Sequence, residues 1–144
     1  MTAKPPHALE VATRVLARRD YSERGLRERL RQAGVTDAEE EEALAALQHA
    51  GVIDDGRFAE ARAQALAQRG KGDAAIRFDL RQQGVPAETA EAAMASLEPE
   101  RERAKRVVAQ RGGGACTARL LARRGFGDEA VEAAIARGDR AELG

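Results

Sequence analysis

The sequence LRERLRQAGV (residues 26–35) recurs as IRFDLRQQGV (residues 76–85), and a weaker third copy, TARLLARRGF, occupies residues 117–126. The first two copies have leucine or isoleucine at helical spacing, and in every copy a glycine that can adopt a positive φ follows just beyond the expected helix C-terminus. Each copy therefore predicts a short amphipathic helix that ends at its glycine. The recurrence itself predicts an internal repeat.

A further helix is predicted on each side of every copy. Apolar residues three and four apart predict helices near residues 8–19, 56–69 and 99–110. Ser22 is a candidate N-cap for the first copy, and Thr36 with Glu39 forms a capping box that opens the helix after it. Each repeat is thus a triplet of helices, with the quoted sequence as its second member.

The predicted fold is all-α, with three tandem three-helix repeats stacked into an elongated, curved array free of right-angle turns. Small three-helix units bury little surface alone, so stacking is expected to contribute part of the stability. Three repeats are predicted, over residues 8–53, 54–98 and 99–137, between flexible termini at residues 1–7 and 138–144.

The composition of the 144 residues limits the class of protein. Lys and Arg together number 24, as do Asp and Glu, so the formal net charge is zero and the charge must be analysed locally. The single cysteine, Cys116, excludes an internal disulfide, and no apolar run approaches the ~20 residues that span a bilayer. We expect a cytoplasmic monomer without a membrane segment.

No residue pattern in the sequence indicates catalysis. His7 and His49 lack partners at metal-ligand spacing, and Cys116 has no evident base. The glycine clusters lack the Lys-Ser/Thr pair of a phosphate-binding loop. Asp54 and Asp55 are interpreted as helix-capping residues. The sequence therefore predicts no enzyme activity, no cofactor and no metal site.

Arginines flank the apolar stripe of the repeated helix and are the candidate binding residues. Guanidinium groups bind phosphates and carboxylates in a bidentate manner, so a DNA backbone and an acidic protein surface are both compatible partners. The alternative interpretation is an ordinary solvated helix face. The candidates are Arg27, Arg31, Arg77, Arg81, Arg119, Arg123 and Arg124.

Charge also alternates along the chain. Residues 1–35, 61–85 and 101–125 are net basic, whereas residues 36–60, 86–100 and 126–144 are net acidic. Because each repeat is basic first and acidic last, stacking of the repeats predicts that the basic first and second helices lie along one side of the array. The acidic third helices are predicted along another side. Glu41 and Glu91 are expected on the solvated, acidic side.

The few aromatic residues do not favour a platform for stacking bases. Tyr21, Phe58, Phe78 and Phe126 are too dispersed for such a platform. Phe58 and Phe126 are expected to fill the core.

The sequence resembles the RecX family, regulators of the bacterial RecA recombinase, from about residue 8 to residue 136. The resemblance lies in GVIDDGRFAEA (residues 51–61), the two copies LRERLRQAGV and IRFDLRQQGV, and LLARRGF (residues 120–126). It implies three tandem three-helix repeats without enzymatic activity. It also implies binding to the RecA–DNA filament and inhibition of the recombinase, ATPase and coprotease activities of RecA, in DNA repair and control of the SOS response.

Two other functions are compatible with short helices joined by glycine turns. One is a transcription regulator with a DNA-binding helix-turn-helix pair, and the other is a helical adaptor without nucleic acid. The predicted third helices begin TDAEEEE and PAETAEA, which are acidic where a recognition helix would meet DNA. The RecA regulator is therefore the leading hypothesis.

Overall fold

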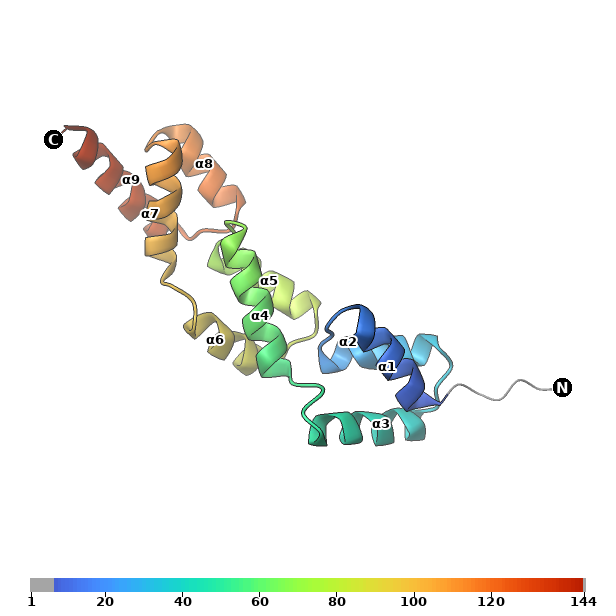
Figure 1. Ribbon diagram of the computed structural model, residues 1–144. Coiled ribbons are helices and arrows are strands. Elements are labelled where there is room, and N and C mark those ends of the chain that lie inside the picture. The colour runs from blue at the N-terminus through green and yellow to red at the C-terminus, as the bar shows by residue number, and fades with distance from the viewer. Residues whose placement is uncertain (1–6, 144) are drawn as a thin grey trace.

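The computed structural model describes the backbone of residues 7–143 and the side chains of residues 7–136. In this range the chain is entirely helical, without strands, and Figure 1 shows three successive three-helix units in an elongated, curved array. The predicted all-α repeat fold is confirmed. The helices are α1 (Ala8–Arg18), α2 (Glu23–Gln32), α3 (Asp37–His49), α4 (Asp55–Gln68), α5 (Asp73–Gln82), α6 (Ala87–Ala95), α7 (Glu100–Arg111), α8 (Ala115–Arg123) and α9 (Asp128–Leu143).

The second helix of each unit ends in the same hydrogen-bonded turn. After α2, Gly34 has a φ of 83°, its N–H donates to the carbonyl of Arg31 at 3.0 Å, and the N–H of Val35 donates to the carbonyl of Leu30 at 3.1 Å. These two bonds define a Schellman motif, which satisfies carbonyls at the helix end. The equivalent bonds of Val85 to Leu80 and of Phe126 to Leu121 end α5 and α8. The repeated glycine therefore stops each helix and brings the next residue into the core.

Side-chain caps fix where several helices begin. Ser22, Thr36 and Asp54 each accept a hydrogen bond from the backbone N–H three residues later, at 3.1, 3.3 and 3.0 Å. Such caps satisfy N–H groups that have no partner inside the helix. The N-caps predicted from the sequence at Ser22 and Thr36, and the capping role of Asp54, are confirmed.

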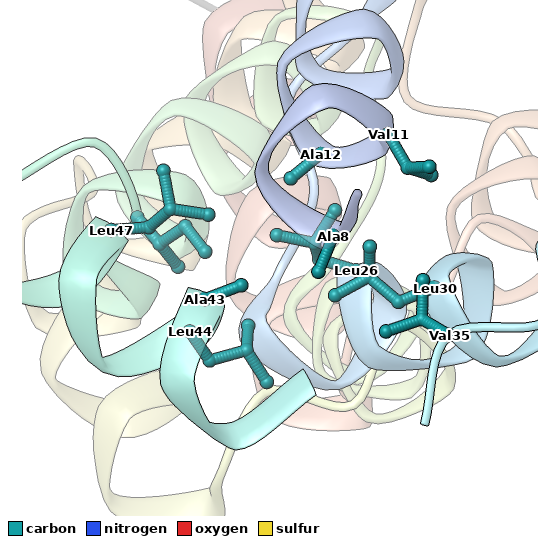
Figure 2. Close-up of a cluster of buried hydrophobic side chains, with 10 residues drawn as sticks. Ala8, Val11, Ala12, Leu26, Leu30, Val35, Ala43, Leu44 and Leu47 are labelled. Carbon is teal, nitrogen blue, oxygen red and sulfur yellow. The ribbon is translucent and has the colours of Figure 1, made fainter. Parts of the chain in front are cut away.

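Each unit buries a hydrophobic cluster of its own. Figure 2 shows the first, in which alanine and valine of α1 meet two leucines of α2 and alanine and leucine of α3. Alanine at the contacts lets the helix backbones approach closely, so the core is thin. Phe58 and Phe126 are 8% and 5% exposed, as expected of core residues. The clusters centre on Leu26, Leu30 and Leu44, on Ile76 and Leu80, and on Leu121 and Phe126.

The last helix, α9, extends to Leu143, and the flexible terminus expected at residues 138–144 stays a prediction. Gly138 does not stop the helix, because an interior glycine costs only about 1 kcal/mol relative to alanine and the neighbouring residues are good helix formers. The predicted flexible segment at residues 1–6 lies outside the described residues. No helix in the described part of the chain is long and apolar enough to cross a membrane.

Replacing Leu80 by alanine is expected to lower the free energy of unfolding by about 2–5 kcal/mol, because this side chain is fully buried and its removal leaves a cavity. Phe78→Ala is the matched control on the same helix, since Phe78 is 59% exposed, and should change stability by no more than about 0.5 kcal/mol. Urea unfolding followed by circular dichroism measures both. Equal losses would contradict the described core.

Candidate arginine surfaces and the joints between units

Two of the candidate arginines on α2 are bound to a buried carboxylate of α3. Glu40 is only 1% exposed, and its two oxygens accept from Arg27 Nη1 and Arg31 Nε, each at 3.1 Å. Arg27 also donates to Glu23 at 2.9 Å and to Glu41. The hydrogen bond to Glu41 is the largest cause of a raised Arg27 pKa, and the same bond lowers the pKa of Glu41. Arg27 and Arg31 therefore tie α2 to α3 within one unit.

The second unit repeats this arrangement in part. Arg77 of α5 donates to Glu91 of α6 at 2.7 Å, and this bond raises the pKa of Arg77. Arg27–Glu41 and Arg77–Glu91 have the same separation in sequence, because both helix pairs pack in the same way around the glycine turn. Glu41 and Glu91 are exposed to solvent, as predicted, but each contacts an arginine, so the predicted separation of basic and acidic sides does not hold at these positions.

The remaining candidate arginines are not held by carboxylates. Arg81, Arg119 and Arg123 are exposed, and among the described residues no ion pair is formed by them. Arg124 is half-buried, and its guanidinium lies against Gly70. The structure therefore divides six of the seven candidates into arginines paired with carboxylates, at residues 27, 31 and 77, and exposed arginines without an ion pair among the described residues, at residues 81, 119 and 123. Arg124 belongs to neither group.

The first joint, between the first and second units, is made by side chains at helix ends. Asp55 at the start of α4 accepts from the backbone N–H of Glu23 at 2.8 Å, where α2 begins. The hydroxyl of Ser22 donates to the carbonyl of Gln83 in the turn after α5. Across this joint the N-terminus of one helix is thus capped from the next unit, which satisfies an orphan N–H.

The second joint, between the second and third units, uses the same position and adds backbone contacts. Glu100 at the start of α7 accepts from the N–H of Asp73 at 3.1 Å and from that of Gly127 at 3.0 Å. In addition, the N–H of Gly72 donates to the carbonyl of Arg124 at 2.8 Å. A Cβ on Gly72 would overlap the backbone of the opposing turn at Gly125. Only glycine permits this approach.

A buried arginine completes the second joint. Arg103 of α7 is 7% exposed, and its guanidinium donates to Asp73 and to the carbonyls of Lys71 and Glu98, both at 2.9 Å. It also lies 5.8 Å from the centre of the Phe126 ring. Sequence reasoning missed this residue and the acid–N–H contacts. The available signal was an acid at the first position of both α4 and α7.

Cys116 is exposed at the start of α8, and its sulfur accepts from Arg119 Nη2 at 3.6 Å. Within the described residues no group of three or more metal-ligating side chains is present. The candidate functional sites are therefore the arginine surfaces and the joints between units.

Replacing Glu40 by glutamine is expected to lower the free energy of unfolding by about 1–3 kcal/mol, since it weakens hydrogen bonds to charged groups at a buried position. Glu41→Gln is the matched control, because the Glu41 side chain is 68% exposed, and should cost less than about 1 kcal/mol. Thermal or urea denaturation compares the two variants. A larger loss for Glu41→Gln would show that the buried ion pairs are misassigned.

Comparisons with known proteins match one unit by sequence and nearly the whole chain by fold. Residues 54–94 match the family model for the second three-helix domain of RecX. The crystal structure of RecX from Lactobacillus salivarius aligns with 92% of this chain and 94% of its own, at a TM-score of 0.80 and 17% identity. A second crystal structure, of regulatory protein RecX, aligns with 88% of this chain and 71% of its own, at a TM-score of 0.71 and 20% identity. No curated protein matches the sequence.

The two kinds of similarity address different features. The family model matches the sequence of the second unit, from the cap at Asp54 through most of α6. The crystal structures, at identities of 17% and 20%, share the fold of nearly the whole chain. The chain is therefore similar in sequence to the RecX family over its second unit, and similar in fold to the two RecX crystal structures over its three units.

Proposed function

We propose that this protein binds the RecA–DNA filament and inhibits the recombinase, ATPase and coprotease activities of RecA, and so acts in DNA repair and control of the SOS response. The observation that supports it is the match of residues 54–94 to the RecX family within a chain that has the RecX fold. The proposal includes action as a cytoplasmic monomer, without a cofactor or an enzymatic activity of its own. Its repeats are taken to cover residues 8–53, 54–98 and 99–137.

An elongated array suits a partner that is itself extended. The units follow one another along the length of the array, so one molecule can contact a filament at several points (Figure 1). We assign the arginine contacts to Arg81, Arg119 and Arg123, because their guanidinium groups are exposed and not already held by carboxylates among the described residues. Arg27, Arg31 and Arg77 are assigned a structural role.

The helix-turn-helix alternative is disfavoured by the third helix of the first unit. Its first turn carries Asp37, Glu39 and Glu40, and Glu40 is buried against arginines of α2. A recognition helix presents donors near its N-terminus to base edges in the major groove. This helix instead presents acids there, which DNA phosphates repel.

The protein is expected to lower the DNA-dependent ATPase of RecA at near-stoichiometric amounts, and to hydrolyse no nucleotide by itself. A coupled ATPase assay with single-stranded DNA, RecA and increasing amounts of the protein measures both rates. The protein without RecA is the control for intrinsic hydrolysis. Unchanged RecA turnover in excess protein would contradict the proposed function and leave the fold unaffected.

Combined replacement of Arg81, Arg119 and Arg123 by alanine is expected to weaken filament binding and to leave stability nearly unchanged, because these side chains are exposed. If the arginines bind DNA phosphates, the salt dependence should flatten by about 0.7–0.9 log unit of slope for each phosphate that the variant no longer binds. Filament pull-down across a salt series measures this.

The matched control for this variant replaces Arg14, Arg101 and Arg111, which are also exposed but were not assigned. It removes the same charge from other parts of the surface. If both triple variants bind and inhibit equally, net charge alone explains the effect and the assigned arginines have no special role.

A further inference from the structure

The first joint carries arginines that the internal ion pairs do not use. Arg19, at the C-cap of α1, donates to the side-chain oxygen of Gln83 at 3.5 Å and has no ion pair among the described residues. Arg29 on α2 and Arg69 at the C-cap of α4 are also exposed and outside the ion pairs of the described range. These three, called the joint arginines below, come from the first and second units.

Two grooves open beside the joint arginines, and Arg19 lines both. One has a volume of about 280 Å3 between Asp20 and α4, and Arg69 is on its wall. The other has a volume of about 120 Å3 between α2 and the end of α5, and Arg29 is on its wall. Because each groove takes side chains from both units, a chain lying along them would cross the joint.

The ring of Tyr21 holds two of the guanidinium groups in place. Arg19 lies 4.4 Å and Arg29 lies 5.6 Å from the ring centre. Cation–π contacts of this kind favour a fixed position of the charge above the ring. The two arginines are therefore ordered before any ligand arrives, which reduces the entropy cost of binding.

The smaller groove has the chemistry of a nucleic-acid contact. Its wall has three arginines and the amides of Gln32, Gln82 and Gln83, and Tyr21 is its one aromatic residue. A protein partner would require an apolar anchor at its centre, whereas nucleic-acid interfaces are polar and positively charged. Its amides suit the edges of unpaired bases, which a duplex conceals. Glu28, the one acid on the wall, is within 3.6 Å of Arg24.

We propose that the joint arginines form a binding site for the phosphate backbone of single-stranded DNA, and that its binding fixes the angle between the first and second units. The choice of DNA over RNA rests on the proposed function. The site itself rests on the grooves and the joint arginines. The first joint is the adjustable one, because side chains at helix ends make its contacts, whereas backbone bonds reinforce the second joint.

The test measures binding to a fluorescent single-stranded DNA oligonucleotide by anisotropy, without RecA. Combined Arg19→Ala, Arg29→Ala and Arg69→Ala should remove three phosphate contacts, each worth about 0.7 in the slope of log affinity against log salt. A fourfold rise in salt should then weaken the unmodified protein about 18-fold more than the variant. Replacement of Arg14, Arg101 and Arg111 is the matched control and should leave the slope unchanged.

Further probes separate the possible ligands. Single-stranded DNA should bind more tightly than duplex DNA, RNA of the same sequence or polyglutamate of matched charge. Tighter binding of any of these three would overturn the assignment, as would equal affinity and slope for the joint variant. Because RecA is absent, a failure to inhibit RecA leaves this result unaffected. If the triple variant loses helical circular dichroism, Arg29→Ala alone replaces it, since Arg29 makes no hydrogen bond across the joint among the described residues.

The angle between the units is tested in the same protein. In a Cys116→Ser background, Glu42→Cys on α3 and Ala92→Cys on α6 place fluorescent labels on exposed positions of the first and second units. Saturating oligonucleotide should shift and narrow the energy-transfer distribution, and the joint variant should show no such change. An unchanged distribution on binding would overturn the proposed effect on the joint.

Discussion

The arrangement of the three units depends on one contact, a carboxylate that accepts from the first backbone N–H of a helix in the preceding unit. Asp55 makes this contact to Glu23, and Glu100 makes it to Asp73. A helix N-terminus has N–H groups without internal partners and a partial positive charge, so an acid from another unit is a favourable cap. Because each unit encloses its own apolar cluster, such polar contacts at helix ends determine how the units are placed.

The two joints use this contact with different support. At the second joint, Gly72 brings two turns into backbone contact and Arg103 binds three acceptors there. At the first joint, Ser22 bonds to the carbonyl of Gln83, and no bond between two backbone groups crosses the joint among the described residues. The stacking expected from the sequence is therefore present mainly as hydrogen bonding. Its geometry is set more firmly between the second and third units than between the first and second.

For the arginines, the role predicted from the local sequence differs from the role that tertiary packing gives them. Arg27 and Arg77 follow the same motif and were interpreted as exposed ligands, yet both meet a carboxylate of the following helix. That pairing depends on the angle between the two helices that each glycine turn joins. Helical periodicity in the sequence does not predict this angle. Arg19 lies outside the repeated motif. It contacts Gln83 only because the second unit packs beside the end of α1.

The sequence by itself determined the helices, their caps and the repeat. Leucine spacing, the glycine after each second helix and polar residues at N-caps act over a few neighbouring residues, so Ser22, Gly34 and Thr36 were assigned correctly. Contacts between helices that are distant in sequence were decided by the tertiary structure. The burial of Glu40, the approach at Gly72 and the accessibility of each arginine depend on how whole units are oriented, and that orientation arises from hydrogen bonds at the joints that local patterns do not encode.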